Sequence, residues 1–96
     1  MSDEKTAAQA DLPRLVALCP IGLYTHRKGG AYVVFAHSID EGNLDPLVHY
    51  YSVAKGTRWT RTVHNFTMLV DGVPRFERVS DVTDEMLARA RGDRGE

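Results

Sequence analysis

Apolar and polar residues alternate along the middle of the 96-residue chain, in runs that polar or glycine-rich turns separate. An apolar period of two is typical of strands that bury one face. The pattern predicts four strands and a shorter fifth, over residues 21–27, 31–38, 47–53, 58–64 and 75–79. Short antiparallel strands curl readily into small barrels, so we predict a mainly β fold, a small SH3-like five-stranded antiparallel barrel.

The two ends of the chain have different patterns. Residues 1–11 are polar without a hydrophobic period, which indicates a flexible N-terminal arm or a frayed helix. Residues 11–18 start at the candidate cap Asp11 and favour a short helix or turn. Residues 83–91 predict a C-terminal helix, with Thr83 as its cap and acidic and basic side chains at the ends that favour them. The expected organisation is the arm over 1–11, one β-barrel domain over 12–80, and the C-terminal helix and tail over 81–96.

The turns predict which residues lie opposite each other. A two-residue turn at Gly29–Gly30 sets Tyr24 opposite Phe35, since both glycines accept positive φ angles. The next turn sets His37 opposite His49. A slip of one residue in either register would exchange the two faces of the sheet.

The third turn brings Trp59 alongside Ser52 and Arg61 alongside Tyr50. Arg61 then lies on the more apolar face, where a charge needs a partner, an open barrel end or a bulge. The residues predicted for this face are Leu23, Val34, Ala36, Val48, Tyr50, Trp59 and Val63.

Composition narrows the class of protein. Twelve Lys and Arg against thirteen Asp and Glu give a net charge of −1, which does not favour nucleic acid or an anionic membrane as a partner. The single cysteine, Cys19, excludes an internal disulfide and suits a reducing compartment. No apolar run approaches the ~20 residues of a membrane helix, and the start of the chain is too polar for a signal peptide. We therefore expect a cytoplasmic protein.

Residues 22–65 concentrate the candidate chemistry. They hold five Lys and Arg against three Asp and Glu, all four histidines, all four tyrosines and Trp59. We expect the functional side chains in this block.

Five motifs in this order carry a family resemblance: the run Gly22–Val34, then Ala36-His37-Ser38, Leu47-Val48-x-Tyr50, Trp59-x-Arg61 and Pro74-Arg75-Phe76. Over residues 22–79 the chain resembles the small bacterial and phage domain of unknown function 1653 (DUF1653). It departs from that pattern at Arg27, where the family usually has an aromatic residue, and at Thr62, where it has a proline. The resemblance implies a short, mostly β fold of bacterial or phage origin, and it implies no activity.

The first candidate site is a polar and aromatic group that alternation places on one face: Tyr24, His26, Lys28, His37 and His49. Imidazole, ammonium and phenol groups offer several donors to an anion, and a tyrosine ring can stack on a base or sugar. Each histidine alone is more typical of a half-exposed strand residue than of a ligand-binding residue, and only the cluster as a whole favours binding equally.

The second candidate site is formed by Trp59, Arg61 and Arg75. An arginine binds carboxylate or phosphate through two donors and stacks on an indole ring. In the alternative interpretation, Trp59 anchors the core and the arginine stems cover it.

Other chemistries have weaker signals. Three neutral histidines such as His26, His37 and His49 suit zinc, but no short metal-binding spacing connects them. His37 and Ser38 are strand neighbours that point to opposite faces, which prevents a direct serine–histidine pair. We therefore expect no metal and no cofactor, and no motif in the sequence indicates a catalytic role.

Our hypothesis is a non-catalytic small-ligand-binding domain, for a nucleotide or another compact anion. A pocket in so short a chain suggests a homodimer. The alternative is a protein-interaction module that binds a peptide or host protein through its aromatic surface.

Overall fold

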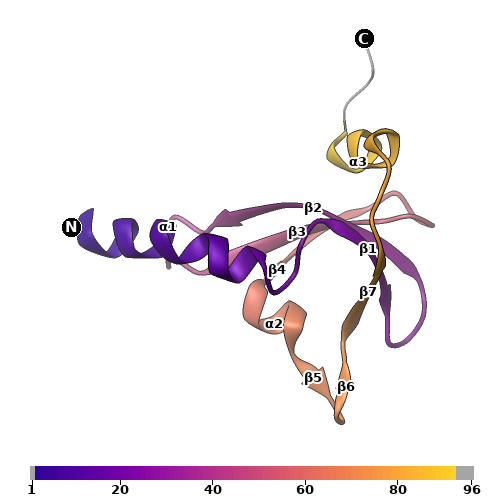
Figure 1. The fold of residues 1–96 in the computed structure, drawn as a ribbon, viewed down its shortest axis with the longest axis horizontal. Helices are drawn as coiled ribbons and strands as arrows, with labels where there is room; N and C mark the ends of the chain where they lie inside the picture. The colour runs from indigo at the N-terminus through magenta and orange to yellow at the C-terminus, as the bar shows by residue number, and fades with distance from the viewer. Residues whose placement is uncertain (1, 93–96) are drawn as a thin grey trace.

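A five-stranded antiparallel sheet organises the chain, and the computed structural model describes residues 2–92 (Figure 1). The strand order is β4-β3-β2-β1-β7, and a separate two-stranded hairpin pairs β5 with β6. The sheet strands are β1 (Gly22–His26), β2 (Ala31–Ile39), β3 (Pro46–Ser52), β4 (Arg58–Thr62) and β7 (Phe76–Ser80), and the hairpin strands are β5 (Leu69–Val70) and β6 (Val73–Pro74).

The predicted mainly β fold with five antiparallel strands is confirmed, as is a helix at each end. Within residues 2–92, no hydrogen-bonded pairing joins the edge strands β4 and β7 to each other. A closed barrel requires that pairing, so the finer prediction of an SH3-like barrel is not confirmed.

In the described part of the chain, three helices accompany the sheet: α1 (Ser2–Val16), α2 (Val63–Thr67) and α3 (Asp84–Arg91). In Figure 1, α3 lies on one side of the sheet, whereas α2 and the β5–β6 hairpin lie on the other. The same view shows α1 extending sideways from the body of the molecule. Over the described residues, no helix combines the length and apolar character needed to cross a membrane.

The C-terminal helix follows its sequence signals. The Thr83 hydroxyl accepts a hydrogen bond from the Met86 N–H at 3.1 Å, which caps the first turn of α3. Gly92 ends the helix in the left-handed conformation, with φ of 88°. The N-terminal helix begins at Ser2, so the prediction that a helix starts after Asp11 is wrong. The flexibility predicted for residues 1–11 stays a prediction.

The sequence did not predict helix α2. The strand expected over residues 58–64 ends at Thr62, and its last two positions belong to α2 instead. The chain leaves β4 at Thr62, whose hydroxyl accepts a hydrogen bond from the Asn65 N–H at 3.0 Å. This cap starts a helical turn that buries Val63 and Phe66. The apolar alternation that suggested a longer strand instead supplies the buried side of α2.

The first hairpin corrects the predicted register. Tyr24 lies opposite Tyr32, not Phe35, because β1 and β2 are joined by a longer loop than the two-residue turn expected. In that loop the His26 N–H donates to the Gly30 carbonyl, and Gly30 has φ of 97°. The register differs from the predicted one by an odd number of residues, so the faces exchange: Tyr24, rather than Leu23, enters the core.

The second hairpin is also shifted, and the prediction that His37 faces His49 is wrong. A register shift between Val34 and Ala36 places Ala36 opposite His49 and His37 opposite Val48. The third hairpin keeps the predicted face but moves the partners, so that Trp59 faces Tyr50 and Arg61 faces Val48.

The main core lies between the inner face of the sheet and α2. Its buried residues are Cys19, Tyr24, Val34, Val48, Tyr50, Val63, Phe66 and Phe76. On the outer face, α3 packs against β2, and both Val33 and Ala90 are fully buried. Arg58 holds this helix by donating from Nε to the Ala90 carbonyl at 2.7 Å.

Candidate functional site

A pocket of about 240 Å³ occupies the part of the inner face that α2 leaves uncovered. All five strands of the sheet contribute to it, together with the turn between β3 and β4. We call the residues that line the pocket its walls. The aromatic walls are Tyr32, Tyr50, Trp59 and Phe76, and the polar walls are His26, Ser52, Lys55 and Arg61. Their shared face follows from the observed pairing: Tyr32 lies opposite Ser52, Tyr50 opposite Trp59, and His26 opposite Phe76.

The aromatic walls form one contact network. Phe76 meets Tyr50 at a ring-centroid distance of 5.2 Å and Tyr32 at 5.6 Å, both edge to face. On its other side Phe76 stacks on the buried Phe66 at 4.2 Å, with the two rings 6° from parallel. Such packing fixes ring positions, so this wall of the pocket is rigidly attached to the core.

Trp59 stands apart from this network. Its residue is 52% exposed on the edge strand β4. The interpretation of Trp59 as a core anchor is therefore wrong. Its indole is available to a ligand that enters the pocket.

Arg61 is the positioned cation of the pocket. Its Nε donates to the Tyr50 hydroxyl at 2.8 Å, and its Nη1 donates to the side-chain amide oxygen Oδ1 of Asn65. Its guanidinium carbon lies 5.8 Å from the centre of the Phe76 ring. These contacts explain why a charged side chain is tolerated on the inner face of the sheet, because neutral hydrogen-bond partners and an aromatic ring surround the guanidinium. No carboxylate within residues 2–92 forms an ion pair with it.

His26 is held in one tautomer. Its Nδ1 accepts a hydrogen bond from the Lys28 backbone N–H at 3.0 Å, so the neutral ring carries its proton on Nε2. Burial lowers the pKa of His26, and the positive charges of Arg61, Arg75, Arg27 and Lys28 lower it further. His26 is therefore a neutral donor at neutral pH.

The remaining polar walls lie at the end of β3. The Ser52 hydroxyl accepts a hydrogen bond from the Lys55 backbone N–H at 3.2 Å, which orders the turn that carries the exposed Lys55 side chain. Among residues 2–92, the pocket walls thus hold two permanent cations, Lys55 and Arg61, and no Asp or Glu. Electrostatically the pocket favours an anion.

Arg75 lies near the pocket without lining it. Its Nε is buried with no hydrogen-bond partner among the described residues, and its Nη2 lies 3.9 Å from the Met68 sulfur. Its charge acts on His26, as the lowered pKa of that histidine indicates. It adds to the positive potential beside the pocket.

The other predicted site residues lie elsewhere. Tyr24 is buried in the core and donates to the Pro20 carbonyl at 2.7 Å. Lys28 is exposed in the β1–β2 loop and contacts His26 only through its backbone N–H. His37 donates from Nε2 to the Cys19 carbonyl at 2.6 Å. His49 bonds the hydroxyls of Ser38 and Thr60, at 2.7 and 3.2 Å.

The structure therefore brings together three of the eight predicted residues, His26, Trp59 and Arg61. It separates the three histidines considered as zinc ligands, and among residues 2–92 no three His, Cys, Asp or Glu side chains gather in metal-binding geometry. Sequence reasoning missed five walls: Tyr32, Tyr50, Ser52, Lys55 and Phe76. For Tyr50 and Ser52 the sequence did hold a signal, because the predicted third hairpin places them on the same face as Trp59 and Arg61.

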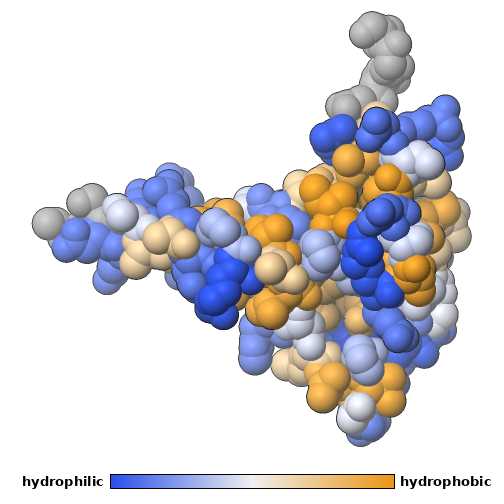
Figure 2. All heavy atoms as spheres, in the orientation of Figure 1, coloured by the Kyte–Doolittle hydropathy of each residue, from blue (hydrophilic) through white to orange (hydrophobic). Residues whose placement is uncertain are grey.

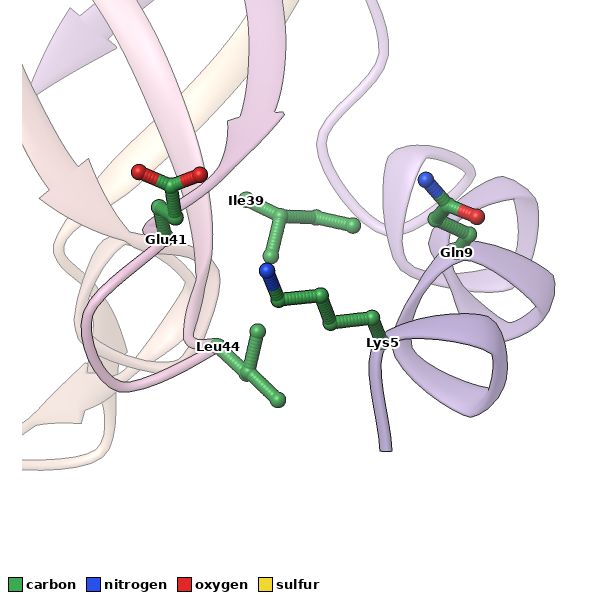
Figure 3. Close-up of a pocket in the computed structure, with 5 residues that line it drawn as sticks. All are labelled: Lys5, Gln9, Ile39, Glu41 and Leu44. Atoms are coloured by element: carbon green, nitrogen blue, oxygen red, sulfur yellow. The ribbon is translucent and has the colours of Figure 1, made fainter. Parts of the chain in front are cut away.

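A second hollow, of about 200 Å³, lies between α1 and the turn after β2 (Figure 3). Lys5 reaches from α1 toward Ile39 and Leu44, with Glu41 nearby. One cation and one anion balance each other here, and no predicted site residue lines this hollow. The pocket on the sheet is the stronger candidate site.

Comparison with known proteins places this geometry in a family. The profile of the family described as "Protein of unknown function (DUF1653)" matches residues 22–78, which include every wall of the pocket. Among solved structures, the chain is similar to the crystal structure of a DUF1653 protein from Bordetella bronchiseptica, with 26% identity and a TM-score of 0.59. That similarity covers 66% of this chain and 90% of the other. A comparison with curated proteins found no match.

Proposed function

The chain belongs to the DUF1653 family, as its five sequence motifs predicted, and from this premise we propose a function that its pocket supports. We propose that the domain binds a compact anionic small molecule that carries a planar ring, such as a nucleotide, without catalysing a reaction. The pocket on the inner face of the sheet is the binding site. Its walls are His26, Tyr32, Tyr50, Ser52, Lys55, Trp59, Arg61 and Phe76.

The observation that carries this proposal is the fixed guanidinium of Arg61, in a pocket that no carboxylate of residues 2–92 lines. Tyr50 and Asn65 hold the Nε and Nη1 sides of the group, and no described residue accepts a hydrogen bond from Nη2. A guanidinium fixed in this way binds an oxyanion without first losing its rotational freedom. Lys55 adds a second positive charge to the same walls.

The ring of the proposed ligand has a partner in Trp59. The indole is half-exposed and lines the same pocket as Arg61, two residues along β4. Stacking of a base on an aromatic side chain contributes about 1–3 kcal/mol.

The size of the pocket favours a compact ligand. Its volume of about 240 Å³ is below the roughly 300 Å³ at which pockets for drug-sized ligands begin. A mononucleotide that leaves part of its surface in solvent fits this limit better than a dinucleotide does.

Binding without catalysis is supported by the side chains around the site. The wall hydroxyl of Ser52 hydrogen-bonds the backbone of its own turn, and the proton-accepting nitrogen of His26 bonds Lys28. Cys19 is fully buried, and burial raises the pKa of its thiol to about 11, so it does not offer a thiolate nucleophile at neutral pH.

The test uses Trp59, the only tryptophan, as a fluorescent reporter in the pocket. Adenosine 5′-monophosphate, adenosine and ribose 5-phosphate separate the contributions of ring and anion. We expect the nucleotide to bind tightest. We expect Arg61→Gln to weaken its binding about tenfold or more, since hydrogen bonds to charged groups contribute about 1.5–3 kcal/mol.

The matched control is Arg14→Gln, which removes an exposed arginine on α1 that pairs with Asp11 and lies outside the pocket. This variant should bind as the unmodified chain does. The proposal is wrong if no phosphorylated compound changes the Trp59 signal, or if Arg61→Gln and Arg14→Gln behave alike.

The alternative function, a protein-interaction module, is favoured by one separate observation. The β5–β6 hairpin exposes Leu69 by 60% and Val73 by 51%, and apolar atoms gather at that tip in Figure 2. An exposed apolar patch suits a partner protein. If this function holds, Leu69→Lys abolishes capture of a partner and leaves nucleotide binding unchanged.

A homodimer and a cytoplasmic location accompany the proposed function as further proposals. A second copy would enclose a ligand that the open pocket leaves half in solvent. Light scattering with and without nucleotide tests this, and a monomer under both conditions counts against it.

A further inference from the structure

We infer that the pocket selects anions that carry no proton on their oxygen atoms, and discriminates against protonated anions of the same charge. The inference rests on the proposed function, because it concerns the ligand class of the same site. It follows from which hydrogen-bonding atoms of the walls are already engaged.

Apart from the Tyr32 hydroxyl, the side-chain acceptors around the pocket are engaged inside the protein. The side-chain amide oxygen Oδ1 of Asn65 accepts from Arg61, and Nδ1 of His26 accepts from the Lys28 backbone N–H. The hydroxyl oxygen of Tyr50 accepts from Nε of Arg61. Each of these bonds occupies an acceptor atom that could otherwise accept a hydrogen bond from a ligand.

The groups left for a ligand are mainly donors. Nε2 of His26 carries the ring proton, and the Lys55 ammonium donates only. The Ser52 oxygen accepts a backbone hydrogen bond from the β3–β4 turn, which leaves its own proton to donate. No wall in the described part of the chain is a carboxylate, the side chain that accepts most strongly from a protonated oxyanion.

A proton on the ligand is therefore costly here. A P–OH group facing these donors lacks a strong acceptor and is left without a full hydrogen bond on binding, which costs about 1–3 kcal/mol. An oxyanion without a proton accepts from every donor. The pocket thus suits sulfate esters, sulfonates, carboxylates and fully ionised phosphate groups.

The first test compares phenyl sulfate with phenyl phosphate at about pH 5, below the phosphate ester's second pKa of about 6. Both then carry one negative charge and the same ring, and only the phosphate carries a proton. We expect phenyl sulfate to bind about tenfold tighter, by Trp59 fluorescence. At about pH 8 the phosphate loses that proton and gains a charge, so the order should reverse.

The second test repeats the comparison with inorganic ions at about pH 8, where His26 is neutral. Sulfate and hydrogen phosphate are both tetrahedral dianions and differ by one proton. Sulfate should displace bound adenosine 5′-monophosphate at about one tenth of the phosphate concentration. Equal competition, or tighter binding of hydrogen phosphate, overturns the inference.

A variant sharpens the test. Ser52→Asp places a carboxylate acceptor in the wall and should shift the preference toward the protonated phosphate. Thr57→Asp adds the same charge in the nearby turn but outside the walls, and should leave the preference unchanged.

The outcomes separate the two proposals. If adenosine 5′-monophosphate binds through Arg61 but protonated and unprotonated anions bind alike, the inference fails and the proposed function stands. If none of these anions binds, both fail.

Discussion

The inner face of the sheet is used in two different ways along its length. One part, which we term the closed half, is covered by α2 and buries Cys19, Val34, Val48, Val63 and Phe66 to 1% exposure or less. The other, the open half, consists of the eight pocket walls, among which Trp59 is 52% exposed. The same strands supply both halves, so the difference comes from the side chains and from what covers them.

The two halves meet at Phe76 and Tyr50. Phe76 stacks on Phe66 in the closed half and contacts Tyr50 and Tyr32 in the open half. The pocket therefore has part of the hydrophobic core as its wall. A site built in this way is positioned by the packing energy of the fold and needs little ordering when a ligand binds.

The largest expected effect is in the closed half. Phe66→Ala removes the buried ring that stacks on Phe76 and should lower the free energy of unfolding by about 3–5 kcal/mol. Chemical denaturation measures this change. A loss below about 1 kcal/mol would contradict the division into two halves, because the ring of Phe66 would then not support the core.

Two tyrosines allow a matched comparison of the halves. Tyr24→Phe removes the hydrogen bond to the Pro20 carbonyl and should cost about 1 kcal/mol of stability while leaving nucleotide binding unchanged. Tyr50→Phe removes the hydroxyl that accepts from Arg61 and should weaken nucleotide binding about fivefold. Its effect on the free energy of unfolding should be smaller than that of Tyr24→Phe. Denaturation and Trp59 fluorescence on both variants measure the two effects. If both variants change the same property, the halves are not functionally distinct.

A smaller effect is expected from pH. Burial lowers the pKa of His26 in the open half and of His49 on the outer face. The unfolded chain then binds protons more readily than the folded chain, so stability is full above the ordinary pKa of 6.5 and falls as pH falls through it. His26→Gln should flatten this profile. A bound anion should reduce the fall, because it stabilises protonated His26.

The smallest effect on stability is expected at Trp59. Trp59→Ala should change the free energy of unfolding by no more than about 0.5 kcal/mol, since the side chain is half-exposed on an edge strand. The same variant should weaken nucleotide binding about fivefold and leave inorganic sulfate unaffected, because it removes stacking and no charge. Isothermal calorimetry is the measurement here, as the reporter tryptophan is lost. A large loss of stability would move Trp59 into the closed half.

Local signals in the sequence were sufficient for the five sheet strands, for α3 and for part of the site, but not for α2 or the β5–β6 hairpin. Alternation located the five sheet strands, and Thr83 with the charges near it located α3. Arg61 stood out because it occupies a position of its strand at which the alternation predicts an apolar residue. Tyr32 and Phe76 gave no such signal, because aromatic residues in strands are typical of any core.

The sequence by itself determined where the five strands of the sheet lie, where α3 begins and ends, and which family the chain belongs to, because alternation, capping and motif order are local properties. Only the tertiary structure decided which side chains share a face. That depends on whether each register is shifted by an odd or even number of residues, which the His26–Gly30 loop and the irregularity near Ala36 set. It also depends on α2, which packs over one half of the sheet and leaves Arg61, Trp59 and His26 around the other.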